Sequence, residues 1–306
     1  MRLPVELLQH IIRVLATPSH HLQFGHSEHV LHAFHQLRLA SHTLHNIATP
    51  LLYSSIIITS HHELLAFLYI SPSLQHHCRA LQLRHANHTL CPLIADLLRV
   101  LSPNLRRLAL DVPGNQLALS MPMREALQSC VHLQDYTRSG YSPMQLFPPP
   151  FSFWPGWKAL CRLVLDGPLV DNTFIQGIAQ LPHLTHLAII EPRWHYSDDG
   201  TEVAAFLGLL KAGRSIQRIL LIYCEATEYY LNSLRRLKGG VTELDVPVHY
   251  VIMREGPPTP MSLIRMHIGD GTLWELDSQS LLTLGHERVS LYQSYSLSFP
   301  PQSVFT

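Results

Sequence analysis

The side chains best suited to chemistry in this sequence are histidines and cysteines that lie close together along the chain. Zinc in proteins takes four such ligands at short spacing, so the segment 76–91 contains enough donors for a structural site. Cys78, however, begins the pattern Cys78-Arg-Ala-Leu81-Gln-Leu83, in which the first, fourth and sixth residues are apolar and suited to burial. We therefore predict no metal and no cofactor. The candidate donors are His76, His77, Cys78, His85, His88 and Cys91.

A second group of histidines recurs at every third position near the N-terminus. Three residues advance an α-helix by about 300°, so successive histidines wind around the helix instead of stacking on one side. They alternate with Val30, Leu31 and Phe34, which form the apolar stripe. The pattern favours a solvated helix face over a metal site. The histidines are His26, His29, His32, His35, His42 and His45.

Motifs of known catalytic sites are incomplete or missing. The zinc-protease motif His-Glu-x-x-His begins at His62 and at His286, but Ala66 and Ser290 stand in place of the second histidine. A Gly-x-Gly at Gly269 lacks the third glycine of a dinucleotide fingerprint. We predict that the chain is not an enzyme and has no catalytic residues.

Composition restricts the class of protein further. With 46% hydrophobic and 14% charged residues, the chain is not expected to be disordered. Its formal net charge of zero gives no basic excess for nucleic acid or an anionic membrane. No apolar run is long enough to span a bilayer, and polar residues interrupt the N-terminal apolar segment. Five cysteines without a Cys-x-x-Cys pair predict reduced thiols in the cytoplasm or nucleus.

A Leu-x-x-Leu-x-Leu pattern recurs through most of the chain, with substitutions. Successive copies begin 22 to 32 residues apart, which brackets the period of leucine-rich repeats. Helical periodicity fills the intervals at 90–101, 123–130, 171–180, 203–212 and 227–237. We predict an α/β fold in which residues 56–306 form an irregular solenoid of parallel strands alternating with helices. The copies begin at Cys78, Leu105, Leu133, Leu160, Leu184, Ile216, Val241 and Leu263.

The third position of each copy is expected to point from the concave face of the solenoid, and it is mostly charged. Adjacent opposite charges could pair with one another. Alternatively, the column is a target-binding surface, with arginines suited to carboxylate or phosphate groups on a protein partner. Both interpretations stand at this point. The column comprises Ala80 and the candidate target-binding residues Arg107, Asp135, Arg162, His186, Arg218, Glu243 and Arg265.

Residues 1–55 predict a separate module of three short helices. The first begins at Pro4 and ends before Thr17-Pro18, the second covers 28–37, and the third covers 39–48 and ends at Thr49-Pro50. Apolar residues of the first helix form a face that is broader than a single core contact needs. This surplus favours a docking role.

The run Leu3-Pro4-x-Glu6-Leu7-Leu8-x-x-Ile11 resembles the opening of an F-box. The run LRLASHTLHNIATPLLYSSI resembles the second half found in fungal F-box-like proteins, in which Leu-x-x-x-Ser leads into Pro-Leu-Leu-Tyr. The loop from Thr17 to Glu28 is longer and more polar than usual, and no tryptophan ends the module. The resemblance implies a substrate receptor that docks on the Skp-type adaptor of a cullin–RING (SCF-type) ubiquitin ligase and holds a protein target. The implied adaptor-binding residues are Leu3, Pro4, Leu7, Leu8, Ile11, Leu37 and Leu39.

One alternative is a leucine-rich-repeat scaffold without a ligase connection, in which the first helices merely cap the solenoid. The two interpretations differ in whether Leu7, Leu8 and Ile11 are exposed in the free chain. Another alternative, a zinc-dependent enzyme, lacks an assembled site in the sequence.

Overall fold

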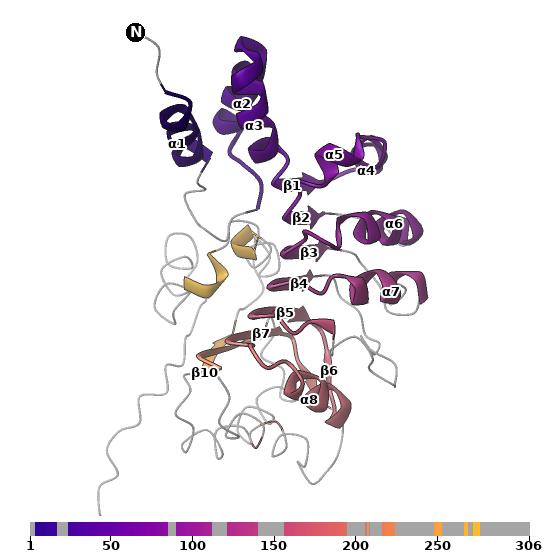
Figure 1. Cartoon of the computed structure of the whole chain (residues 1–306). Coiled ribbons are helices and arrows are strands. Elements are labelled where there is room, and N and C mark those ends of the chain that lie inside the picture. Colours follow the sequence, from indigo (N-terminus) through magenta and orange to yellow (C-terminus); the bar gives the residue numbers. More distant parts are fainter. Residues whose placement is uncertain are drawn as a thin grey trace, which may run out of the picture.

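The computed structural model describes residues 4–16, 24–84, 90–111, 121–139, 156–194, 206, 208, 216–223, 248–252, 266–268 and 272–275. Three helices at the N-terminus lead into a parallel sheet with helices along one face (Figure 1). The predicted α/β class and the predicted alternation of parallel strands with helices are therefore confirmed in the described part of the chain.

The N-terminal helices are α1 (Val5–Ala16), α2 (Glu28–Ala40) and α3 (His42–Leu52). Both α1 and α2 pack against α3. The small core between them contains Ile12, Phe34, Ala48 and Leu52. Ser41 caps α3, because its side chain accepts a hydrogen bond from the backbone N–H of Leu44 at 3.2 Å.

The predicted bounds of the third helix were wrong. Leu39 belongs to α2, and α3 continues through Thr49-Pro50 to Leu52. Proline disfavours a helix interior because it lacks an N–H and crowds the preceding turn. Here Thr49 and Leu52 on either side of Pro50 are buried. Packing of the last turn therefore outweighs the local cost of the proline.

Within the described residues, one sheet contains eight parallel strands in the order β1-β2-β3-β4-β5-β7-β9-β10. A second, two-stranded parallel sheet pairs β6 (Leu169–Val170) with β8 (Arg193–Trp194). Apart from β1, the strands of the large sheet up to β9 begin at the third position of a repeat copy. Their bounds are β1 Ser55–Ile58, β2 Ala80–Leu83, β3 Arg107–Asp111, β4 Asp135–Ser139, β5 Arg162–Asp166, β7 His186–Ile190, β9 Arg218–Tyr223 and β10 Val248–Ile252.

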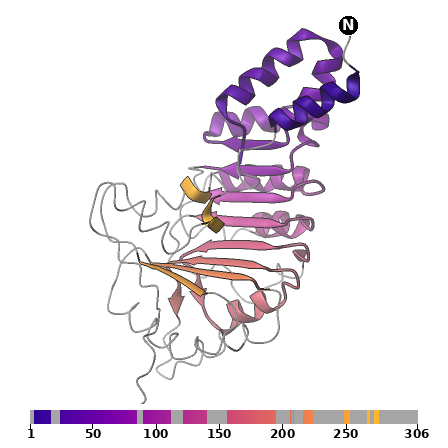
Figure 2. The same cartoon turned by 90° about the vertical axis from the view of Figure 1, so that its left-hand side faces the viewer.

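Helices cover one face of this sheet, and the main core lies between them (Figures 1 and 2). The repeat leucines supply the strand side of this core, as the pattern predicted; Leu81, Leu108 and Leu163 are fully buried. The predicted helices 90–101, 123–130 and 171–180 are confirmed with small shifts, and residues 206 and 208 are helical. The predicted helix 227–237 lies outside the described residues. The helices are α4 His61–Leu68, α5 Pro72–Gln75, α6 Cys91–Leu101, α7 Met121–Ser129 and α8 Asn172–Ala179.

The last two repeat copies lie mostly or wholly outside the described residues; this holds for the whole copy that begins at Val241. The strand that pairs with β9 is β10, in which Val248 lies opposite Ile219. Valine, tyrosine and isoleucine in β10 favour a strand. Residues 266–268 are helical, so the copy that begins at Leu263 is not a strand there.

Candidate functional site

The predicted column exists on the sheet face opposite α6 and α7, which we call the column face. Strand pairing places its residues side by side in successive strands. The register follows from the repeat, since each strand begins at the same position of its copy. Glu243 and Arg265 lie outside the described residues. The column contains Ala80, Arg107, Asp135, Arg162, His186 and Arg218.

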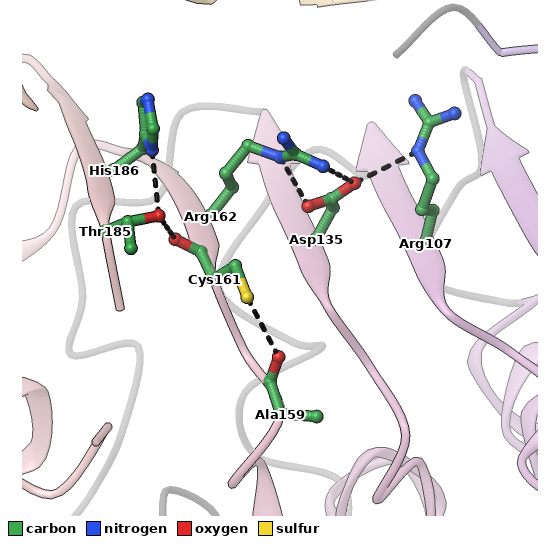
Figure 3. Close-up of polar contacts among 7 residues, drawn as sticks. All are labelled: Arg107, Asp135, Ala159, Cys161, Arg162, Thr185 and His186. Carbon is green, nitrogen blue, oxygen red and sulfur yellow. Dashed lines mark hydrogen bonds and ion pairs between the residues drawn. The ribbon is translucent and has the colours of Figure 1, made fainter. Parts of the chain in front are cut away.

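Two arginines share one carboxylate at the centre of the column (Figure 3). Arg162 donates from Nε to Asp135 Oδ1 at 2.6 Å and from Nη2 to Oδ2 at 3.0 Å. From the other side, Arg107 Nε lies 3.2 Å from Asp135 Oδ2. The pairing interpretation of the charged column therefore holds for these three residues. The Asp135 carboxylate thus lies between two guanidinium groups.

Because these three side chains are mostly buried, their charges interact more strongly than they would in water. The side chains of Arg107, Asp135 and Arg162 are 17%, 11% and 26% exposed. Burial lowers the pKa of Arg107 from its ordinary value, with a further lowering from Arg162, while Asp135 raises it. Arginine remains protonated despite such shifts. The cluster is thus permanently charged and mostly buried, and its guanidinium groups suit anionic groups.

At His186 and Arg218, a segment of the chain itself covers the column. The ring of Trp274, in the 3₁₀-helix η3 (Leu273–Glu275), lies 5.2 Å from the ring of His186 in an edge-to-face arrangement. Arg218 donates from Nη1 to the carbonyl oxygen of Trp274. Burial lowers the pKa of His186, and Arg162 and Arg218 lower it further against the opposing effect of Asp135. His186 is therefore neutral at pH 7.

At the other end of the column, Phe24 covers Arg107 and Ala80. The guanidinium of Arg107 lies 4.4 Å from the centroid of its ring, within the range of a cation–π contact. The ring also packs against Ala80 and Ala109. Gly25 holds this loop in place: its φ is +72°, and its N–H donates to Ser55 Oγ at 2.7 Å.

Between these two covers lies a pocket with an arginine-rich floor. Phe24 forms one wall, and the segment that includes Leu273 and Trp274 forms the other. The remaining lining residues are Arg107, Asp135, Thr137, Arg162, Val164 and Ile268. The site therefore combines apolar walls with charged hydrogen-bond donors.

Sequence reasoning missed Phe24, Leu273 and Trp274. Phe24 stands in a polar loop, and its only local signal is the glycine that follows it. Leu273 and Trp274 follow the Gly-x-Gly that begins at Gly269, a pattern that predicts a turn but does not indicate which part of the sheet the next residues contact. These contacts join segments far apart in sequence, so periodicity does not encode them.

Some of the thiols and histidines that the sequence offers as candidate metal donors lie in the described chain. No group of three or more His, Cys, Asp or Glu side chains within the described ranges is placed to hold a metal ion. Cys78 and Cys91 lie in the main core, and burial raises the pKa of Cys78 to about 12. His76 bonds instead to Asn104, at 2.8 Å. His85 and His88 lie outside the described residues.

Histidines of α2 are solvated, as predicted. His29, His32 and His35 are all exposed. His26 differs because it precedes the helix: its Nε2 lies 2.9 Å from the carbonyl oxygen of Leu51, and its ring contacts Phe34 edge to face.

The residues implied in adaptor binding lie mostly at the surface of the helical module. Leu7 and Ile11 are 44% and 42% exposed, and Leu39 is 82% exposed. Pro4 is also exposed, whereas Leu8 is half-buried. Leu37 packs partly against the module core. Leu3 lies outside the described residues.

Comparison of the sequence with models of protein families and with curated proteins gave no match. Within the described residues, every helix is too short or too polar to traverse a lipid bilayer.

Proposed function

We propose that this protein is the substrate-recognition subunit of a cullin–RING (SCF-type) ubiquitin ligase. The helical module is the F-box-like part and binds the Skp-type adaptor. The sheet and its helices are an irregular leucine-rich-repeat-like solenoid, and the column face binds a protein target. The chain performs no chemistry itself; it holds the target near the ubiquitin-charged enzyme, so the rate gain comes from proximity.

The observation that carries this proposal is the apolar exposure of α1. Ile12 faces the module core, yet Val5, Leu7, Ile11 and Val14 are between 42% and 60% exposed. A helix that only capped the solenoid would bury such residues against its first strand. A contiguous exposed apolar surface is typical of a protein-binding site. The exposure, together with the F-box resemblance at the same residues, favours the receptor over the capped scaffold.

The column face supports the second half of the proposal. Three guanidinium groups and one carboxylate lie in line on β3, β4, β5 and β9. Packing alone does not require charges at these positions, because the alternate residues already form the core. Arginines on a rigid sheet suit carboxylate or phosphate groups of a protein target.

A rigid connection between the two parts suits such a receptor, because the target must be held at a fixed distance from the ligase. The loop before α2 makes this connection. Gly25 bonds to Ser55 of β1, His26 lies within hydrogen-bond distance of the Leu51 carbonyl in α3, and Phe24 rests on β2 and β3. The long polar loop that departs from the usual F-box thus contributes a clamp between module and sheet.

The test is capture of the purified Skp-type adaptor by the intact chain and by a Leu7→Asp/Ile11→Asp variant. We expect capture by the intact chain and its loss in the variant, with an unchanged melting temperature because both residues are exposed. Val100→Asp is the matched control, since Val100 is 49% exposed on α6, away from the module. Failure of the folded intact chain to capture the adaptor would refute the ligase connection and leave a repeat scaffold.

A further inference from the structure

We infer that the column face recognises a short peptide segment carrying a leucine–tryptophan pair, and that residues 266–268 and 272–275 of this chain occupy that place in cis. The inference deepens the proposed function and rests on it, because it names the kind of target segment and a competitor within the chain. Figures 1 and 2 show residues 266–268 and 272–275, in yellow, over the sheet face opposite α6 and α7.

Two contacts join the described parts of the segment. The backbone N–H of Thr272 donates to the carbonyl oxygen of His267 at 2.9 Å, and His267 Nδ1 lies 2.7 Å from Thr272 Oγ1. Ile268 and Leu273 both line the pocket on the column face. Both are buried, at 6% and 1% exposure.

The segment contacts residues of the column. Trp274 touches His186 with its ring and receives a hydrogen bond from Arg218 on its backbone carbonyl. Leu273 lines the pocket above Arg107 and Arg162. The residues proposed for target binding are thus already engaged, by an aromatic ring, a buried leucine and one carbonyl oxygen.

This contact set has the size of a peptide motif. Two apolar anchors and one backbone acceptor are an arrangement by which short segments dock on a rigid surface. In the described part of the segment, Met266 is exposed and His267 and Trp274 are only half-buried. A target segment with the same anchors can replace it without disturbing the main core, which lies on the other face of the sheet.

The charged residues of the column face indicate which residues should flank the leucine–tryptophan pair of the ligand. Beside the apolar anchors, the face presents the guanidinium groups of Arg107, Arg162 and Arg218; the first two contact the Asp135 carboxylate, and the third donates to the carbonyl oxygen of Trp274. Acidic residues flanking the leucine–tryptophan pair suit these guanidinium groups better than basic ones do. The ligand is therefore an acidic peptide segment with adjacent leucine and tryptophan.

The experiment uses a fluorescein-labelled synthetic peptide of residues 266–275 and the full-length chain. In a Leu273→Asp chain the internal segment should leave the face, since Asp is costly at a buried apolar position. We expect this variant to bind the peptide at least tenfold more tightly than the unaltered chain, in which the tethered segment competes at high effective concentration. The measurement is fluorescence anisotropy.

Two matched controls define the site. A peptide with the same Leu→Asp change should not bind. Arg218→Ala in the Leu273→Asp background should weaken binding about tenfold, because the charge-assisted bond to the carbonyl is lost. Equal affinity of both chains, absence of binding to the folded variant, or indifference to Arg218→Ala would each overturn the inference.

A second variant covers the case in which Leu273→Asp does not fold. Trp274→Ala keeps the buried leucine and removes only the ring that contacts His186, so it too should bind the peptide more tightly than the unaltered chain. Adaptor capture is a separate readout. A chain that captures the adaptor but shows no peptide binding refutes this inference alone, and one that binds the peptide without the adaptor refutes only the ligase connection.

Discussion

Asp135 accepts two hydrogen bonds from the guanidinium of Arg162, at 2.6 and 3.0 Å, and so links β4 to β5 through their side chains. The same carboxylate faces Arg107 at 3.2 Å. It is therefore the common counter-charge of two arginines that are less than a third exposed. Removing it takes away the ion pair that both arginines make with Asp135.

Asp135→Asn should lower the free energy of unfolding by about 2–4 kcal/mol, because removing one member of a mostly buried ion pair is costly. Denaturant unfolding measures this change. The matched control is Asp96→Asn: the Arg99–Asp96 pair is also short, at 2.8 Å, but its side chains are 40% and 63% exposed. The control should cost less than about 0.5 kcal/mol. Equal effects of both substitutions would contradict the structural role of the cluster.

Gly25→Ala should destabilise the junction between the helical module and the sheet by about 1–3 kcal/mol. Its φ of +72° is strained for a side chain, and an added Cβ would lie 2.6 Å from Ile57 Cδ1. Gly208→Ala is the control, because it lies in a helical segment and a Cβ there would meet nothing within 4 Å. That substitution should stabilise by up to about 1 kcal/mol. Thermal unfolding of the two variants distinguishes these opposite signs.

The order of the sheet and its charged column could be predicted from sequence because both follow from one repeating interval. Once each strand starts at the same repeat position, parallel pairing brings Arg107, Asp135 and Arg162 side by side. The repeat pattern does not predict the elements that follow β9. β10 does not coincide with a repeat copy, and the copy that begins at Leu263 contributes helical residues at 266–268.

The covers of the column face could not be predicted in the same way. Phe24 reaches Arg107 across more than eighty intervening residues, and Trp274 reaches His186 across a similar interval. Such contacts depend on the three-dimensional path of loops, which leaves no pattern in neighbouring residues. Sequence could indicate that the column carries charge, but not that an aromatic residue covers each end of it.

Native-state thiol labelling should leave Cys78 and Cys130 unmodified at pH 8. Burial raises the pKa of each to about 12, so almost no reactive thiolate exists in the folded chain. Iodoacetamide treatment followed by peptide mass spectrometry measures the modification, and denatured protein is the control in which both should react. Rapid labelling of either cysteine in the folded chain would contradict its place in the core.

Stability should fall as the pH is lowered from about 7.5 to 5.5, partly through His26 and His186. Burial lowers the pKa of both below the ordinary 6.5, and Arg162 and Arg218 add to this at His186. The unfolded chain therefore binds more protons in this range, so the stabilisation present above pH 6.5 is lost as the pH falls. Melting temperatures of the unaltered chain and of a His26→Gln/His186→Gln variant measure the difference. The variant should lose less stability on acidification, and an equal loss would show that the other histidines account for the whole pH dependence.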